Sequence, residues 1–234
     1  MKWTLITGGA RGLGREISRT LAVKRKKLVI HYHRSASEAL ELQGQLRRLG
    51  VDVEILEGDF STVASTQLFI DQYIKQFSDT DTVVNNVGNY LLGAATAIHP
   101  QELNQLFHLN VTASLMVIQS LLPSLKQSHG HIVNMGMVGS NAVAANTYAS
   151  AYNMTKLALA MLTKSLAKEL APYITVNMVS PGYTERSIDL PSDLSSIPMQ
   201  RPARLEEVAH TVEFLLEQTY ITGQNIEVAG GTKL

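Results

Sequence analysis

Short apolar runs alternate along the chain with longer stretches of helical periodicity. The apolar runs are rich in Val and Ile and show little polar alternation, which is typical of parallel strands buried on both faces. They predict strands at Trp3–Thr7, Leu28–His33, Val51–Leu56, Thr82–Asn85, His131–Met135, Ile174–Met178 and Asn225–Val228. The stretches between them predict helices at Gly12–Val23, Ser35–Leu49, Val63–Phe77, Gln101–Leu122, Ala151–Leu170 and Leu205–Glu217.

This alternation predicts an α/β fold. Strand–helix–strand units form right-handed crossovers, which indicates a single doubly wound parallel sheet of about seven strands, a Rossmann fold, with helices on both faces. No change in composition marks a boundary, so we expect residues 1–234 to form one domain. The long stretch Gly182–Arg204 lacks periodicity and contains several prolines. We interpret it as a lid over a functional site, with a surface excursion as the alternative.

Composition narrows the functional classes. The chain has 20 basic and 20 acidic side chains, a balance that argues against a broad nucleic-acid or anionic-membrane surface. It has no cysteine, which excludes disulfides and thiolate chemistry, and its seven histidines show no metal-ligand spacing. We find no apolar run of about 18 residues and no signal peptide. We therefore expect a cytoplasmic protein with no metal, nucleic-acid or membrane partner.

A glycine-rich turn joins the first predicted strand to the first predicted helix. It reads Thr7-Gly8-Gly9-Ala10-Arg11-Gly12-Leu13-Gly14. Glycine lets the backbone approach a pyrophosphate closely, and a helix N-terminus supplies N–H donors. The position of this turn predicts dinucleotide binding, with contacts from Gly8, Arg11, Gly12, Leu13 and Gly14.

The end of the second predicted strand bears on the choice between NAD and NADP. A carboxylate here would bind the ribose 2′-hydroxyl of NAD, but the sequence reads His33-Arg34-Ser35. The Arg34 guanidinium and the Ser35 hydroxyl, together with Arg11 in the turn, suit a 2′-phosphate. We therefore expect NADPH rather than NADH.

A tyrosine and a lysine four residues apart open the helix predicted at Ala151–Leu170. At this spacing Tyr152 and Lys156 share one helix face. An ammonium group beside a phenol favours the phenolate and lowers its pKa from about 10. A tyrosine tuned in this way can protonate a carbonyl oxygen as hydride arrives at the carbon.

Together these motifs resemble those of the short-chain dehydrogenase/reductase family, over almost the whole chain. Further matches are Asp59-Phe60, Asn85-Asn86-Val87-Gly88, Asn110, Ser180-Pro181-Gly182-Tyr183-Thr184, Ile221-Thr222-Gly223 and Ala229-Gly230-Gly231. The resemblance implies that Tyr152 is the general acid, that Lys156 lowers its pKa and binds the nicotinamide ribose, and that Asn110 holds a proton-relaying water. It also implies cofactor contacts from His33, Arg34, Ser35, Asp59, Phe60, Asn86, Val87, Gly88, Tyr152, Lys156, Pro181, Gly182 and Thr184.

The serine that orients the substrate carbonyl in this family is missing from its expected place. Counted forward from the fifth strand, its position falls on Met137; counted back from Tyr152, it falls on Gly139, next to Ser140. A thioether cannot donate a hydrogen bond. Either Ser140 takes the role of the serine, or no hydroxyl orients the carbonyl and Ser140 belongs to a turn.

A second departure lies at the end of the first predicted helix. The family commonly has glycine there, because the turn tends to need a positive φ. Here Arg25 takes that place. Its presence indicates a re-formed turn or a cost of about 1 kcal/mol.

The resemblance implies an NADPH-dependent oxidoreductase that reduces a carbonyl, with a 3-oxoacyl thioester or similar ketone favoured. Met137 leaves two alternatives open: an enoyl or pteridine-type reductase of the same family, in which Tyr148 could contact the substrate, and a catalytically weak NADP(H)-binding sensor or scaffold. Pteridine reductases share the H-Y-x-R-S stretch but have an aspartate where Met137 stands. The family usually forms tetramers, so a homotetramer or dimer is expected, packed through the helices at Gln101–Leu122 and Ala151–Leu170.

Overall fold

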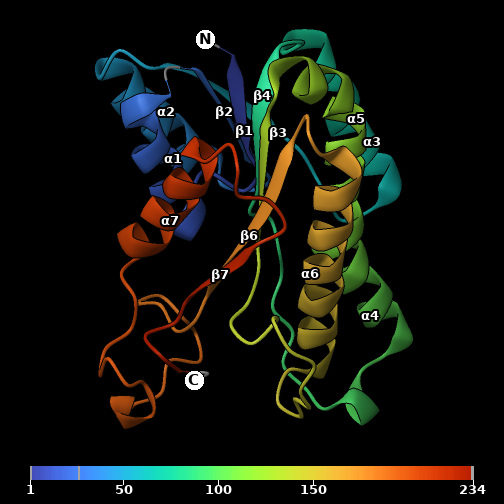
Figure 1. The fold of residues 1–234 in the computed structure, drawn as a ribbon, viewed down its shortest axis with the longest axis vertical. Helices are drawn as coiled ribbons and strands as arrows, with labels where there is room; N and C mark the ends of the chain where they lie inside the picture. Colours follow the sequence, from blue (N-terminus) through green and yellow to red (C-terminus); the bar gives the residue numbers. More distant parts are fainter. Residues whose placement is uncertain (1, 26, 233–234) are drawn as a thin grey trace.

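The predicted strands form one parallel sheet (Figure 1). The computed structural model describes residues 2–25 and 27–232, and orders the strands β3-β2-β1-β4-β5-β6-β7. All neighbouring pairs are parallel. The order reverses between β1 and β4, and ligands of doubly wound sheets bind at such a switch point, beyond the carboxyl ends of the strands. The bounds are Trp3–Ile6 (β1), Lys27–Tyr32 (β2), Asp52–Glu57 (β3), Thr80–Asn85 (β4), His131–Met135 (β5), Thr175–Pro181 (β6) and Asn225–Val228 (β7).

Helices cover both faces of the sheet, which confirms the predicted fold class (Figure 1). One layer comprises α1 (Gly12–Lys24), α2 (Ala36–Arg48) and α7 (Leu205–Glu217); the other comprises α3 (Val63–Gln76), α4 (Pro100–Phe107), α5 (Ala113–Ser128) and α6 (Ser150–Leu170). Each layer buries its own apolar cluster against the sheet, represented by Ile17 and Val212 on one face and by Phe69 and Val117 on the other. Burying each such side chain contributes about 1.5–3 kcal/mol, so these two clusters hold the layers in place.

A π-helical segment, His108–Thr112, separates α4 from α5, where the sequence predicted one uninterrupted helix. Asn110 lies inside this segment and is fully buried. Its amide donates to the Asn89 carbonyl at 3.1 Å and to the Thr155 hydroxyl at 2.9 Å. Such π segments frequently occur at functional sites, because the widened turn redirects a side chain.

By length and composition alone, one continuous helical segment, Pro100–Ser128, could cross a membrane. The sequence pattern predicted no span of this kind. In the structure the segment lies over the sheet, and its Val117, Ile118 and Leu121 side chains belong to an apolar cluster of the core. A core helix of a globular protein meets the same two criteria, so they indicate a membrane only weakly.

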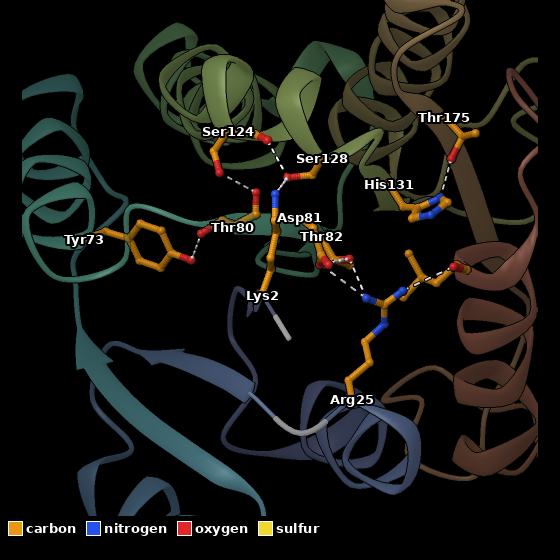
Figure 2. Close-up of polar contacts among 11 residues, drawn as sticks. Lys2, Arg25, Tyr73, Thr80, Asp81, Thr82, Ser124, Ser128, His131 and Thr175 are labelled. Atoms are coloured by element: carbon orange, nitrogen blue, oxygen red, sulfur yellow. Dashed lines mark hydrogen bonds and ion pairs between the residues drawn. The ribbon is translucent and has the colours of Figure 1, made fainter.

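Arg25 ends α1 without a left-handed turn. Its φ of −98° lies in the extended region, so the strain expected of a non-glycine residue at positive φ does not arise. Its guanidinium donates to the Asp81 carboxylate at 3.3 Å, the Thr82 hydroxyl at 2.8 Å and the Leu216 carbonyl at 3.2 Å (Figure 2). The turn is therefore re-formed, and the arginine ties α1 to β4 and α7.

Candidate active site

The glycine-rich turn lies between the end of β1 and the start of α1, at the switch point of the sheet. Gly12 has a φ of +55°, in the left-handed region that favours glycine. A Cβ on Gly14 would lie 2.1 Å from the Gly8 carbonyl oxygen, so no side chain fits where the helix approaches the turn. The start of α1 therefore packs closely on the turn, and Leu13 packs partly against the apolar core beneath it. Dinucleotide binding at this turn stays a prediction.

The end of β4 fixes this turn from the neighbouring strand. The Asn86 amide donates to the carbonyls of Thr7 and Gly8, both at 3.1 Å. The Thr7 hydroxyl accepts the N–H groups of Asn86 and Val87 at 2.9 and 3.1 Å. Gly88 follows, and a Cβ there would lie 3.3 Å from both the Asn110 amide oxygen and the Lys156 ammonium. The turn and the predicted catalytic residues are therefore joined through one strand end.

Of the residues predicted for the 2′-phosphate, Arg34 and Ser35 follow β2, whereas Arg11 lies in the glycine-rich turn just before α1. His33, Arg34 and Arg11 are exposed, and Ser35 is half-buried. In the part of the chain that the structure describes, neither arginine has an acidic partner within 4.0 Å. Asp59 lies 3.9 Å from the His33 ring and accepts hydrogen bonds from Ser61. Those bonds lower its pKa, with smaller contributions from His33 and Arg34.

The Phe60 side chain is buried, whereas the resemblance implied a cofactor contact from this residue. It is 4% exposed and lies in the apolar core, where its ring stacks on His31 with centroids 4.3 Å apart. Phe69 packs edge-on against it at 5.0 Å. Asp59 has the more exposed side chain of the two residues, and a cofactor contact from Phe60 stays a prediction.

His31, in β2, supports the glycine-rich turn from behind and was missed as a functional residue. Its Nδ1 accepts the Gly8 N–H at 2.9 Å, and its Nε2 lies 3.0 Å from the Gly58 carbonyl, so Nε2 must carry the proton. Burial lowers the pKa of His31 to about 4, which keeps the ring neutral. A polar ring in the middle of an apolar strand was the signal that could have found it.

A His31→Leu substitution is expected to weaken NADPH binding by about tenfold, because it leaves the Gly8 N–H and the Gly58 carbonyl without partners in a buried place. His31→Asn keeps an acceptor near Gly8 and should recover part of the loss. Fluorescence titration with NADPH measures the effect, with His210→Leu, a change at an exposed histidine of α7, as control. Wild-type affinity in His31→Leu would mean that the histidine only fills the core.

Lys156 and Tyr152 both lie in the first turns of α6. The Lys156 ammonium is buried, donates to the Met135 carbonyl at 2.8 Å and lies 5.6 Å from the centroid of the Tyr152 ring. Burial lowers the pKa of Lys156 to about 8. Burial also raises the pKa of Tyr152 to about 12, with a smaller contribution from Asp189. This direction is opposite to the one expected from the lysine alone.

The Tyr152 hydroxyl makes no hydrogen bond within residues 2–25 and 27–232, so its proton is free to meet a ligand. Behind it, Thr155 is held by the Asn110 amide at 2.9 Å. The Asn110 oxygen accepts the Asn89 N–H at 2.8 Å. Asn110 therefore fixes both α6 and the loop after β4, and brings the predicted acid, lysine and asparagine to one place.

Ser140 lies in a turn of its own. Its hydroxyl donates to the Met137 carbonyl, and its N–H donates to the same oxygen at 3.2 Å. The Glu227 carboxylate of β7 holds this turn by accepting the Gly139 N–H at 2.9 Å and the Asn141 amide at 3.1 Å. This geometry favours the turn interpretation of Ser140 over a catalytic one.

Tyr90 and Asp189 complete the surroundings of Tyr152, and sequence reasoning missed both. The rings of Tyr90 and Tyr152 meet edge to face, with centroids 4.6 Å apart. The Tyr90 hydroxyl donates to Asp189 at 2.8 Å. Neither residue belongs to a motif. The prediction that 182–204 covers a functional site pointed to the segment of Asp189, and nothing in the sequence pointed to Tyr90.

The segment after β6 begins beside this site. Gly182 donates to the Val228 carbonyl at 3.0 Å, and a Cβ on it would lie 2.9 Å from Ala229. The Thr184 N–H donates to the Ser187 hydroxyl at 2.9 Å. Pro181 ends β6, so these predicted contacts lie at the same edge of the sheet as the glycine-rich turn. Among the described residues, no three potential metal-ligating side chains come together.

Comparison with known proteins decides the family. A model described as short chain dehydrogenase matches residues 2–192. The chain belongs to the short-chain dehydrogenase family. A 3-oxoacyl-[acyl-carrier-protein] reductase of Staphylococcus aureus is 32% identical over 241 residues, covering 98% of this chain and 97% of that protein. An uncharacterized oxidoreductase of Bacillus subtilis is 32% identical over 242 residues, covering 98% of each.

Solved structures with similar folds support this family assignment. A blue fluorescent protein from a metagenomic library, in complex with NADPH, superposes with a TM-score of 0.91 at 26% identity, over 100% of this chain and 98% of that one. An alternative dihydrofolate reductase of Brucella suis, in complex with NADP, superposes with a TM-score of 0.88 at 27% identity, over 99% and 94%. The protein is thus an oxidoreductase of the short-chain dehydrogenase family that uses a nicotinamide cofactor and acts on a small-molecule substrate.

Proposed function

We propose that this short-chain dehydrogenase reduces a ketone with NADPH and that Tyr152 is its general acid. The observation that carries the proposal is the convergence of Tyr152, Lys156 and Asn110 beside the glycine-rich turn. The Lys156 ammonium lies 5.6 Å from the centroid of the Tyr152 ring. The Asn110 amide donates to the hydroxyl of Thr155, which precedes Lys156 in the same helix. A protein that only senses the cofactor has no need of a free phenol placed in this way.

The residues present fit a phosphorylated dinucleotide. The turn of Gly8, Gly12 and Gly14 leads into the N-terminus of α1, and at Gly14 a Cβ would lie 2.1 Å from the Gly8 carbonyl oxygen, so no side chain fits there. The N–H groups of a helix that follows such a turn are suited to bind a diphosphate. Arg11 and Arg34 present guanidinium groups without acidic partners in the described residues, which suits a 2′-phosphate. Two solved relatives were crystallised with NADPH or NADP. When bound, the cofactor supplies hydride.

The residues of the chain itself supply and hold the proton. Tyr152 donates its phenolic proton to the substrate oxygen, because its hydroxyl has no other partner among the described residues. Lys156, with a pKa near 8, is the nearest group able to stabilise the resulting phenolate. Asn110, to which the resemblance assigns a relay water, keeps the Asn89 backbone in place.

A ketone is favoured as substrate because of the Staphylococcus aureus relative, a 3-oxoacyl-[acyl-carrier-protein] reductase. An enoyl or pteridine-type reductase remains the second candidate, and one observation favours it. Met137 offers no donor, and the Ser140 hydroxyl is bound within its own turn. In the enoyl alternative the exposed Tyr148 contacts the substrate, so Tyr148→Phe lowers turnover only there.

NADPH oxidation, followed at its absorbance band with a 3-oxoacyl and an enoyl thioester in parallel, tests the proposal. Turnover of the 3-oxoacyl thioester supports carbonyl reduction, whereas turnover of the enoyl thioester alone supports the second candidate. Tight NADPH binding without turnover of any ketone in a broad panel would instead support the alternative function of an NADP(H)-binding sensor or scaffold.

Replacement of Arg34 by Gln is expected to weaken NADPH binding by about 10- to 100-fold while leaving NADH binding nearly unchanged. The reason is that the Arg34 guanidinium would pair with the 2′-phosphate, the group in which the two cofactors differ. Arg48→Gln, at an exposed arginine in the last turn of α2, is the matched control. Isothermal titration with both cofactors measures the ratio of affinities, and an unchanged ratio would remove Arg34 from the phosphate site.

A further inference from the structure

A carboxylate lies close to the proposed acid, in a place that no shared motif explains. Asp189 belongs to the segment between β6 and α7, which Figure 1 shows beyond the carboxyl ends of the strands. Its Oδ2 accepts the Tyr90 hydroxyl at 2.8 Å, and the Tyr90 ring lies edge-on to the Tyr152 ring at 4.6 Å. One aromatic side chain therefore links Asp189 to Tyr152.

The Asp189 carboxylate has capacity left for another partner. Within residues 2–25 and 27–232, Oδ2 is its only oxygen that accepts a hydrogen bond, and no Lys, Arg or His nitrogen lies within 4.0 Å of the carboxylate. A carboxylate can accept about four hydrogen bonds, so Oδ1 is open. The residue is only half-buried, and a ligand that enters beside Tyr152 can reach it.

Tyr90 holds this carboxylate in a defined position. Burial, followed by the hydrogen bond to Asp189, raises the pKa of Tyr90, so its proton stays in that bond. The Tyr90 N–H is itself fixed by the Asn89 side chain at 3.0 Å, and the Asn89 backbone is bound by Asn110. Asp189 is thus anchored to the same loop that positions the proposed catalytic residues.

We propose that Asp189, positioned by Tyr90, is a substrate-binding carboxylate that selects ketones carrying an ammonium group near the carbonyl. This inference rests on the proposed carbonyl reduction and narrows its substrate class. An ammonium group would meet the open oxygen of Asp189 in a charge-assisted hydrogen bond. A carboxylate in the same position of the substrate would be repelled, because like charges close together in a partly buried site are unfavourable.

Pairing of the Asp189 carboxylate with a substrate ammonium group would also assist proton transfer from Tyr152. Asp189 contributes to the raised pKa of Tyr152 because its negative charge disfavours the phenolate. A bound ammonium group neutralises that charge and so makes the phenol a better acid. Tyr90 is accordingly a positioning residue, and Asp189 is the group that contacts the substrate.

The test compares three ketones of equal chain length that carry a terminal ammonium, methyl or carboxylate group. NADPH oxidation is measured for the wild type, Asp189→Asn and Tyr90→Phe. The wild type should prefer the ammonium ketone over the methyl ketone by about 10- to 100-fold in kcat/KM, with the carboxylate ketone last. Asp189→Asn should bring the ammonium-to-methyl ratio of kcat/KM to about one, and Tyr90→Phe should reduce the preference in part.

Asp193→Asn is the matched control, since Asp193 is an exposed carboxylate in the same segment whose one hydrogen-bond partner among the described residues is Ser195. An equal ammonium-to-methyl ratio in the wild type and Asp189→Asn would overturn the inference while leaving carbonyl reduction standing. Turnover of none of the ketones would instead remove the proposed carbonyl reduction, and this inference with it.

Discussion

Replacement of Tyr152 by Phe should lower kcat/KM for ketone reduction by about 100- to 10,000-fold, the contribution typical of a positioned general acid. The substitution removes only the hydroxyl, which makes no hydrogen bond in the described part of the chain. The fold and the ring contact with Tyr90 therefore remain. NADPH affinity should change little, so the loss should appear in kcat rather than in cofactor binding.

Steady-state NADPH oxidation, combined with a cofactor titration, separates these two effects. Tyr173→Phe is the control, since Tyr173 follows the far end of α6 and its side chain is 51% exposed. A Tyr152→Phe enzyme with more than about a tenth of the wild-type rate would exclude the phenol as the acid. In that case Lys156 becomes the candidate proton donor, because it is the nearest titratable group with a pKa near neutrality.

The fold and the motif residues could be predicted because they depend on local sequence. Buried parallel strands need continuous Val- and Ile-rich runs, and a close turn between strand and helix needs glycine at defined spacing. These requirements leave a strong pattern, so the sheet, the turn at Gly8–Gly14 and the helix of Tyr152 and Lys156 were all found in their expected places. NADP preference and the catalytic roles remain predictions.

Features that depend on tertiary contacts could not be predicted. Asn110 lies in a π segment, and its side chain bonds to residues 21 and 45 positions away in the chain, which no local pattern reveals. His31 supports Gly8 across 23 positions, and Tyr90 reaches Asp189 across 99. The pKa of Tyr152 is raised and not lowered, because burial, which no spacing reveals, is the largest cause and Asp189 adds to it.

A valine at Gly14 should reduce NADPH affinity by at least about 100-fold. The new Cβ would lie 2.1 Å from the Gly8 carbonyl oxygen and 2.6 Å from the Asn86 amide nitrogen, so the backbone of the turn must move. A shift of that kind misaligns the N–H groups at the start of α1, and several charge-assisted hydrogen bonds to phosphate, each contributing about 1.5–3 kcal/mol, are lost together.

Gly44→Ala provides the matched control for this substitution. Gly44 lies within α2, where a Cβ would meet only an Arg48 guanidinium nitrogen at 3.8 Å, so this change should raise the free energy of unfolding by about 0.5–1 kcal/mol and leave affinity unchanged. Calorimetric titration with NADPH and thermal unfolding without it separate loss of binding from loss of structure. Wild-type affinity in a folded Gly14→Val protein would mean that the cofactor diphosphate does not bind at this turn, and the proposed function would then lose its foundation.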